Sequence, residues 1–453
     1  MLVPSFDRRE LAMTRMLVLV RHGKAQARTE ERADETRTLT PAGRRALDAR
    51  LPAMLSLLQV DGAETAQVWT SPAERTVQTA DALVDALDEA GVRLEGEVRI
   101  ENCLWEQDID AFRQRLRACD ADVVFAVGHN PFVEEVCQRV SGSAISFATG
   151  AMAALRLADE EQGVPARLLW FAQGPESRLW KTLCFMDRRF AEGADELERR
   201  TQEFLADPDE PETCHKLRVS IRTLRSLLAF AEPFMKASFS KRLQRDLRSV
   251  VRTLSRLREL DVFAGELRGL DAPALDLCAA VEADRDAERD AVIAFLSSDK
   301  TEKLMAHILE RLRAIRWKGS TERNGLAPET VRSAFDLMLI DTTARLDELD
   351  YADAEETHHV RKECKKARYV ARAFGALLGE DAAVAAKAMA AKQDDLGALC
   401  DARVNVALCD SVEDEGLSED AKTNLSALRL AAEAVVNDAL RAHSQVESPL
   451  YAE

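Results

Sequence analysis

The sequence predicts an N-terminal α/β three-layer sandwich followed by an all-α helical-bundle domain with two pseudo-repeats. At 453 residues the chain is two to three times the commonest domain size. Short apolar runs alternate with amphipathic stretches up to about residue 185, and long helical periodicity replaces the strand signals from about residue 195. We therefore expect an N-terminal extension (1–15), an α/β domain (16–185), a linker (186–195) and a helical domain (196–445).

In the first domain we expect buried strands to form a sheet and amphipathic helices to form the layers on its two faces. Short apolar runs predict strands at Leu17–Val20, Ala66–Trp69, Val123–Val127, Ala151–Leu157 and Ala166–Phe171. Proline and glycine near their starts mark two predicted helices, at Ala42–Leu58 and Thr76–Ala90. Alternation of this kind favours a mostly parallel sheet with helices on both faces.

A charged pattern occurs twice in the helical domain. The spacing H-x-x-R-x-x-x-R-x-x-R begins at His215 and begins again at His358, with one lysine in place of an arginine. Between the two copies, Trp317–Pro328 contains two glycines and a proline, which indicates a loop. We therefore expect two helical sub-bundles that repeat one another, roughly separated by this loop.

The charge of the chain is strongly segregated. The net charge is −17, which argues against a general nucleic-acid binder. Between His215 and Arg258, however, basic residues predominate, and Glu232 and Asp246 are the acids of that stretch. A locally basic surface inside an acidic protein can bind a polyanion while the remaining surface disfavours indiscriminate contact.

Cysteine content and hydropathy indicate the cellular compartment of the protein. The nine cysteines are odd in number and form no C-x-x-C pair, so we expect neither a disulfide framework nor a zinc site. Apolar runs such as Met16–Val20 are too short to span a bilayer or to form a secretory signal. We expect a cytoplasmic protein with no metal, no cofactor and no membrane partner.

Polar motifs follow the predicted strands where the chain enters the next helix. Arg21 and His22 end the first strand, Arg75 follows the second, and His129 follows the third. Open α/β sheets place their ligands at the carboxyl ends of strands. Arginine forks bind phosphoryl oxygens, and one imidazole can attack phosphorus while the other donates to the developing charge.

Over residues 16–175 this pattern resembles the histidine phosphatase superfamily, the phosphoglycerate-mutase-like proteins, and within it the small SixA type. The supporting motifs are R-H-G at 21–23, L-T-x-x-G at 39–43, S-P-x-x-R-T-x-Q-T at 71–79 and G-H-N-P at 128–131. The resemblance implies that His22 forms a phosphohistidine in a metal-free phosphate pocket made by Arg21, Arg75 and His129. The family's usual proton donor lies between the second arginine and the second histidine. Glu106 is the nearest candidate here, with an exposed helix-start residue as the alternative reading.

The repeated spacing in the second half has a geometric meaning. Positions i, i+3, i+7 and i+10 fall within about 80° on one helix face, so each copy forms one basic stripe. Lys241, Arg245, Arg248 and Arg252 form another. An ion-paired bundle face is the alternative. The stripes have few acids nearby and lack interleaved aromatic residues, so a regular polyanion fits them better than a nucleic acid.

Over residues 196–440 the chain resembles the conserved histidine α-helical domain, or CHAD. The matching segments are 215–225, 358–369 and 396–401, and Arg258-Glu259 stands where the family often has Arg-Asp. The resemblance implies two pseudo-symmetric bundles around a basic channel that binds inorganic polyphosphate. The expected contact residues are His215, Arg218, Arg222, Arg225, Arg245, Arg248, Arg252, His358, Arg361, Lys365 and Arg368.

Together these patterns predict a histidine phosphatase that hydrolyses a phosphohistidine or phosphomonoester and carries a polyphosphate-binding domain. Little chain is available for a substrate lid, which favours an open site that accepts a phosphorylated protein or another bulky phosphate ester. The expected substrate is a phosphorylated protein or a small phosphate ester. Two alternatives stay open. Polyphosphate itself is the substrate, or the phosphatase half is only a scaffold for a binding protein.

Overall fold

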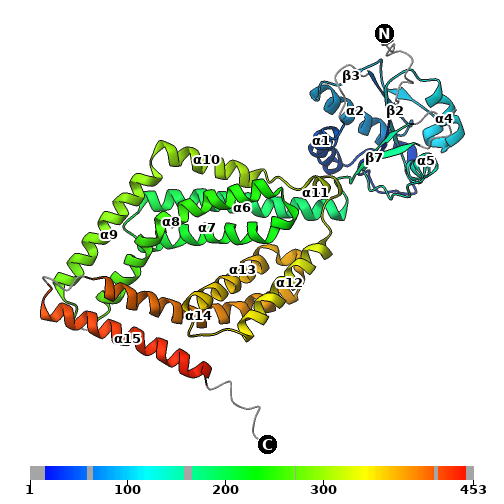
Figure 1. Cartoon of the computed structure of the whole chain (residues 1–453). Coiled ribbons are helices and arrows are strands. Elements are labelled where there is room, and N and C mark those ends of the chain that lie inside the picture. Colours follow the sequence, from blue (N-terminus) through cyan, green and yellow to red (C-terminus); the bar gives the residue numbers. More distant parts are fainter. Residues whose placement is uncertain (1–15, 59–64, 158–165, 271, 413–416, 445–453) are drawn as a thin grey trace, which may run out of the picture. The chain divides into compact units, whose positions relative to one another are not determined.

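A computed structural model describes residues 16–58, 65–157, 166–270, 272–412 and 417–444. The chain divides into two compact units (Figure 1). The first comprises Met1–Leu183 with Gly319–Ala327, and the second comprises Cys184–Lys318 with Pro328–Glu453. The expected extension (1–15) lies outside the described residues.

A seven-stranded mixed sheet forms the centre of the first unit. The strand order is β3-β2-β5-β1-β6-β7, with β4 also paired to β2. The parallel core is β2, β5 and β1, whereas β6 and β7 are antiparallel. The strands span Met16–Arg21 (β1), Thr65–Thr70 (β2), Arg93–Leu94 (β3), Arg99–Ile100 (β4), Val123–Gly128 (β5), Met152–Arg156 (β6) and Arg167–Ala172 (β7).

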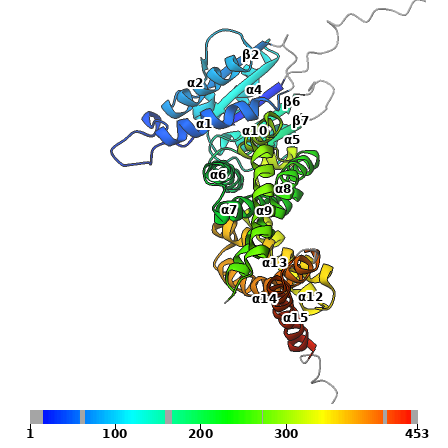
Figure 2. The ribbon, with the colours of Figure 1, turned by 90° about the vertical axis from the view of Figure 1, so that its left-hand side faces the viewer.

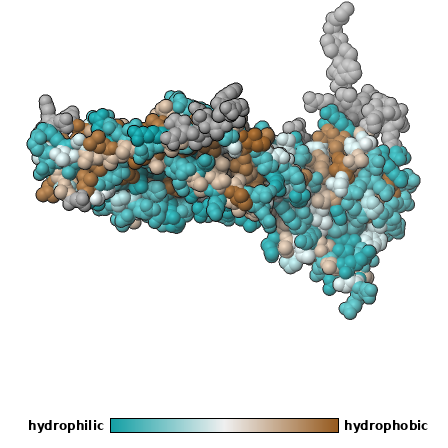
Figure 3. Space-filling view, turned by 90° about the horizontal axis from the view of Figure 1, so that it is seen from below, coloured by the Kyte–Doolittle hydropathy of each residue, from teal (hydrophilic) through white to brown (hydrophobic). Residues whose placement is uncertain are grey.

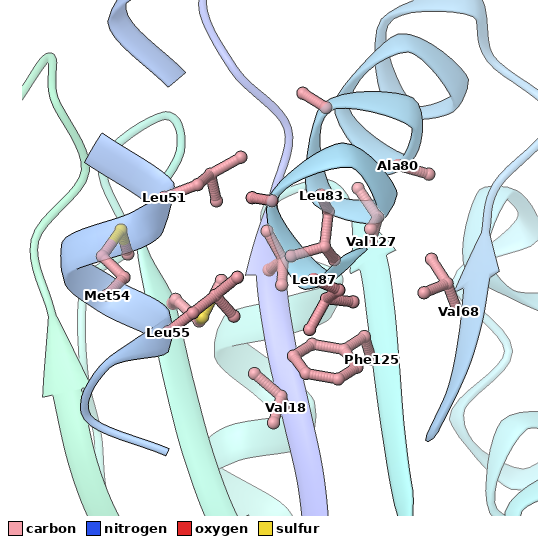
Figure 4. Packing of buried hydrophobic residues seen from close by; sticks show 14 of the residues in the cluster. Val18, Leu51, Met54, Leu55, Val68, Ala80, Leu83, Leu87, Phe125 and Val127 are labelled. Carbon is pink, nitrogen blue, oxygen red and sulfur yellow. The ribbon is translucent and has the colours of Figure 1, made fainter. Parts of the chain in front are cut away.

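Helices cover both faces of this sheet. Their bounds are Pro41–Leu55 (α1), Glu74–Glu89 (α2), Cys103–Glu106 (α3), Ile109–Arg117 (α4) and Phe132–Ser141 (α5). Because successive strand residues point to opposite faces, Val18 joins the core beneath α1 and α2, and Leu19 joins the core beneath α4 and α5. Figure 4 shows the first of these cores, with Leu51 from α1 and Leu83 from α2 packed over the sheet. The expected three-layer α/β sandwich is confirmed.

The second unit is built from long helices (Figures 1 and 2). They are α6 (Arg178–Ala206), α7 (Pro211–Ala231), α8 (Ala237–Arg268), α9 (Leu275–Leu296), α10 (Asp299–Arg313), α12 (Pro328–Asp347), α13 (Ala354–Leu378), α14 (Asp381–Ser411) and α15 (Glu419–Ser444). Neighbouring helices α7 and α8 pack together, as do α13 and α14, and α7 also packs against α13. These contacts bring the two copies of the charged pattern side by side. Figure 3 shows a mainly hydrophilic surface with several separate hydrophobic areas.

The expected linker at 186–195 is wrong, because these residues belong to α6. Met186, Phe190 and Ala194 are buried at four-residue spacing, which is one face of an α-helix. The polar residues between them suggested a connection, but they lie on the other faces of a continuous helix.

The expected loop at 317–328 also differs from the structure. Residues 319–327 belong to the first unit and include the short helix α11 (Gly319–Asn324). Arg50 donates from Nη2 to the carbonyls of Glu322 and Arg323, at 3.1 and 3.3 Å. Gly325 has a φ of +74°, and a Cβ there would lie 2.5 Å from the Leu179 backbone. The segment is thus a return of the chain to the first unit rather than a simple divider.

Candidate functional site

A pocket of about 350 Å³ lies where β1, β2 and β5 end. Arg21 and His22 come from the end of β1, Arg75 from the start of α2, and His129 from the residue after β5. The parallel register explains this convergence, because Arg21 pairs with Gly128 and Thr70 pairs with Val127. The lining residues are Arg21, His22, Lys24, Ala25, Arg28, Asp34, Arg37, Arg75, His129, Asn130 and Thr149.

His22 is held as a neutral imidazole. Its Nδ1 donates to the Gly23 carbonyl at 2.7 Å, so Nε2 is the unprotonated nitrogen of the neutral ring. Burial lowers the pKa of His22 to about 4, and the nearby charges of Arg75 and Arg21 act in the same direction. Gly23 is required at this turn, because a Cβ would lie 2.4 Å from Leu47. The ring therefore presents a lone pair suited to nucleophilic attack.

His129 is also neutral, with both ring nitrogens engaged. Nδ1 lies 3.1 Å from Arg75 Nη2, which can only donate, so Nδ1 accepts. Nε2 therefore carries the proton and donates to Ser71 Oγ at 2.7 Å. Burial lowers the pKa of His129 to about 3, with the charge of Arg75 as the next cause. The chain from Ser71 through His129 fixes the guanidinium of Arg75.

Arg75 is buried and Arg21 is half-buried, and each has a donor without a partner among the described residues. Arg21 Nη1 donates to the Phe147 carbonyl at 2.5 Å. The Arg75 guanidinium lies 5.6 Å from the ring centre of Trp105, which also packs edge-on against His129. Within the described residues, the Nε atoms of Arg21 and Arg75 are buried and have no hydrogen-bond partner. Such donors suit an anion.

A second concentration of cations lies in the helical unit. His215, Arg218, Arg222 and Arg225 lie on α7, and His358, Arg361, Lys365 and Arg368 occupy the matching positions of α13. We use the name basic groove only as a label for these eight residues taken together. Their environments repeat as well, because Arg225 Nε donates to Gln244 at 3.3 Å and Arg368 Nη1 donates to Gln393 at 3.0 Å.

Burial and mutual repulsion dominate the electrostatics of the basic groove. Burial lowers the pKa of Lys365 to about 8, and the charges of Arg361 and Arg222 lower it further. Burial likewise lowers the pKa of His358 to about 4, followed by the charges of Lys362 and Arg222. Because Arg222 lies on α7 and Lys365 on α13, cations of the two copies lie close enough to act on one another.

The motif at 396–401 contacts Arg361, one of the basic-groove residues. Asp401 accepts from both terminal nitrogens of Arg361, at 3.1 and 3.2 Å. At Gly397 a Cβ would lie 3.2 Å from the Arg361 guanidinium, so glycine leaves room for that side chain. Even so, Arg361 Nε and Arg218 Nη1 are buried without a partner in the described part of the chain. These equivalent arginines have unused donors.

Family models match both halves of the chain. Residues 17–124 match the histidine phosphatase superfamily (branch 1), and residues 188–410 match the CHAD domain. The chain carries a histidine phosphatase domain and a CHAD domain. No curated protein matches the chain.

Three solved structures illustrate the likeness. The CHAD domain of the plant Ricinus communis shares 23% identity, covering 57% of this chain and 89% of its own, with a TM-score of 0.47. PptA from Streptomyces chartreusis shares 14%, covering 58% and 97%, with a TM-score of 0.45. The protein histidine phosphatase SixA complexed with tungstate shares 21%, covering 35% and 97%, with a TM-score of 0.28.

In the histidine phosphatase domain the structure departs from one expected site residue. Glu106 is exposed at the end of α3 and does not line the pocket, whereas its neighbour Trp105 contacts His129. The carboxylate that does line the pocket is Asp34, in the loop after β1. Sequence reasoning missed it because that loop has no periodicity. The available signal in the sequence was the spacing of Asp34 from Arg37, three residues further along the chain, with which it forms an ion pair.

In the CHAD domain the basic stripe on α8 is only partly joined to the groove. The charge of Arg248 acts on Arg225 and Lys362. Arg245 and Arg252 are exposed, and neither forms an ion pair or hydrogen bond among the described residues. Sequence reasoning missed Lys362 on α13 and Arg258 on α8, whose charges act on His358 and His215.

Among the described residues there is neither a candidate metal site nor a candidate membrane-spanning helix. No group of three or more His, Cys, Asp or Glu in the described ranges is placed to hold a metal ion. Across those ranges, no helix combines the length and the apolar character needed to cross a bilayer.

Proposed function

We propose that the N-terminal domain is a phosphatase that hydrolyses a phosphohistidine or a phosphomonoester through a phosphohistidine on His22. The observation that carries this is the neutral His22, anchored through Nδ1 beside Arg21 and Arg75. Nε2 attacks phosphorus, the bond to the leaving group breaks, and the leaving group departs with the bonding electrons and takes a proton from solvent. Water then attacks the phosphohistidine, which releases inorganic phosphate and restores the ring.

The neighbouring residues have distinct parts in this proposal. Arg21 and Arg75 stabilise the phosphoryl oxygens as charge builds in the transition state. His129 accepts from Arg75, so in this tautomer it acts by positioning that arginine. Glu106 as the proton donor is not supported, because it lies outside the pocket lining.

Hydrolysis of an aryl phosphate tests the proposal. We expect His22→Ala to lower turnover by about 10⁴-fold or more, because the nucleophile is lost. The matched control is His307→Ala on α10, which removes an exposed histidine outside both sites and leaves turnover within about twofold. Equal turnover by the His22→Ala protein and the wild type would exclude the phosphohistidine route.

We propose that the CHAD domain binds inorganic polyphosphate. The supporting observation is the eight-residue basic groove, in which cations from both repeats lower one another's pKa. A chain of phosphates placed between α7 and α13 offsets that repulsion. Its evenly spaced charges match stripes that carry cations three and four residues apart.

Salt dependence tests this binding. Replacing Arg218, Arg222 and Arg225 by alanine should weaken binding and reduce the slope of log affinity against log salt by about 2 to 3, following the rule for nucleic acids. A control replaces three exposed, ion-paired arginines, Arg199, Arg313 and Arg429, and should leave the slope unchanged. An unchanged slope in the groove variant would mean that these residues do not meet the polymer.

A second candidate substrate is polyphosphate itself. Lys24, Arg28 and Arg37 line the pocket in addition to Arg21 and Arg75, which is more positive charge than one phosphoryl group requires. Phosphate release from length-defined polyphosphate, measured for the wild type and His22→Ala, decides between the two. Release that depends on His22 makes the polymer a substrate. Binding without release makes it a tether.

We also propose a cytoplasmic location. All nine cysteines of the chain are free thiols. Burial raises the pKa of Cys214 to about 12 and that of Cys364 to about 11, which leaves both thiols unreactive. Mass spectrometry of the protein from its native host, alkylated under denaturing conditions at lysis, should therefore count nine alkylated cysteines.

A further inference from the structure

Asp34 lies in the phosphate pocket and binds its central arginine. Its carboxylate Oδ2 accepts from Arg75 Nη2 at 2.9 Å, and its backbone carbonyl accepts from Arg75 Nη1 at 2.5 Å. Its Oδ1 accepts from Arg37 Nη1 at 2.7 Å and lies 3.3 Å from Arg28 Nε. The Asp34 side chain is 24% exposed and that of Arg75 is 5% exposed, so this ion pair is shielded from water.

These contacts occupy the fork that a phosphoryl group needs. Both terminal nitrogens of Arg75 donate to Asp34, and Nη2 also donates to His129. An anion that binds both terminal nitrogens must therefore replace Asp34, although Arg75 Nε has no partner among the described residues. Asp34 gives the guanidinium two oxygens, one from its carboxylate and one from its backbone carbonyl, and a phosphoryl group can give two of its own.

The charge state of Asp34 sustains this contact. Burial tends to raise its pKa, but the hydrogen bond from Arg37 and the charges of Arg75 and Arg28 together lower the pKa below the ordinary value. The carboxylate is ionised at neutral pH. It therefore acts as a fixed anion and carries no proton to give to a leaving group.

We propose that Asp34 is an internal competitor of the phosphoryl group for Arg75, and so a positioning residue that limits how tightly the pocket retains inorganic phosphate. The inference rests on the proposed phosphatase function, whose product is that ion. When the pocket holds no anion, Asp34 keeps the Arg75 guanidinium in place. When a phosphoryl group binds, the displaced carboxylate lies beside a dianion, and their repulsion favours release of the product.

Binding of inorganic phosphate to the full-length protein tests this. Asp34→Asn keeps the size of the side chain and removes its charge. The matched control is Glu35→Gln, which removes the same charge from the adjacent, exposed residue that does not line the pocket. The readout is the fluorescence of Trp105, whose ring lies near the Arg75 guanidinium and packs edge-on against His129. The Trp105→Phe variant identifies this signal, because it removes the fluorescence of Trp105 and leaves that of the other tryptophans. This readout reports the pocket and not the basic groove.

We expect Asp34→Asn to bind phosphate about tenfold more tightly and Glu35→Gln to stay within twofold of wild type. Asp34→Ala, whose side chain cannot hydrogen-bond to Arg75, should also bind more tightly. Unchanged or weaker binding in both Asp34 variants would overturn the proposal. Because the titration needs no turnover, an inactive wild type would refute the proposed function and leave this result readable.

Kinetics separate competition from proton transfer. Under competition, the inhibition constant of phosphate falls in Asp34→Asn by the same factor as the binding constant, and Asp34→Glu restores the wild-type value. A variant that loses turnover, shows an altered alkaline limb of its pH profile and keeps wild-type phosphate affinity would make Asp34 an acid instead. That outcome contradicts the proposal.

Discussion

The two anion sites of this protein neutralise their cations in different ways. In the phosphatase pocket, Arg75 is bound by Asp34 and His129, and Arg21 donates to a backbone carbonyl. In the basic groove, Arg222 on α7 lowers the pKa of Lys365 on α13, and Arg361 lowers the pKa of Arg222. The pocket has its own acid, whereas repulsion in the groove is relieved only in part, by residues such as Asp401.

This difference matches two kinds of ligand. A site for chemistry needs its groups held in one geometry before the substrate arrives, and the hydrogen bonds to His22, His129 and Arg75 provide that. A site for a polymer needs a row of charge with little built-in competition. The groove therefore stores repulsion that the proposed polyanion would offset on binding.

Charge reversal in the groove should have the largest effect. We expect Arg222→Glu combined with Lys365→Glu to weaken polyphosphate binding by at least about 100-fold, since both side chains are half-buried among other cations. Aryl phosphate hydrolysis should stay within twofold. Circular dichroism controls for folding. Loss of both properties in a folded protein would show that the two sites are one functional unit.

Acid should act on the pocket through its two histidines. NMR titration should find His22 and His129 neutral down to pH 5, because their pKa values lie at about 4 and 3. As the pH falls, the histidines of the unfolded chain are protonated near pH 6.5, before those of the folded protein. The two histidines therefore contribute fully to the free energy of unfolding above about pH 6.5. This contribution is lost as the pH falls through the folded pKa values, by on the order of 3 kcal/mol for each histidine. Protonation of either ring near pH 6.5 would contradict this account.

Polyphosphate should stabilise the CHAD domain against heat. A ligand at 100 times its dissociation constant adds about 2.7 kcal/mol, which raises the melting temperature of a domain of this size by about 5–10 °C. Inorganic phosphate at the same total phosphorus serves as the control and should give a much smaller shift. If the two ligands shift the transition equally, the groove does not recognise a polymer.

The smallest expected effect concerns Lys365. Its pKa of about 8 leaves part of its amines neutral and reactive at pH 8. Bound polyphosphate should restore the charge and slow amine labelling of Lys365 about fivefold, measured by peptide mass spectrometry. Labelling of the exposed Lys303 should change less than twofold. Equal protection of both lysines would indicate a general surface effect.

Sequence alone predicted the pocket well where strands dictate it. Motifs at the ends of β1, β2 and β5 had to converge, because parallel strands in register bring their carboxyl ends to one edge. Asp34 was missed because the path of the loop after β1 depends on contacts with Arg75 and Arg37 that no local pattern encodes. Glu106 was chosen by its place in the chain, which does not set the direction of α3.

In the helical half, sequence predicted the stripes but not their orientation. The spacing placed Arg222 and Arg225 on one face of α7 correctly. The rotation of α8 about its axis is set by packing, so Arg245 and Arg252 could not be told from Arg248 and Arg258. The linker was misplaced because α6 changes from one unit to the other without a break in helical periodicity.

The most direct measurement is to trap the phosphorylated protein. Incubation with an aryl phosphate, rapid quenching in alkali and peptide mapping should place one acid-labile phosphate on His22, with none in His22→Ala. Phosphate on another residue, or none in a wild-type protein that is turning over substrate, would contradict the assignment of His22 as the nucleophile.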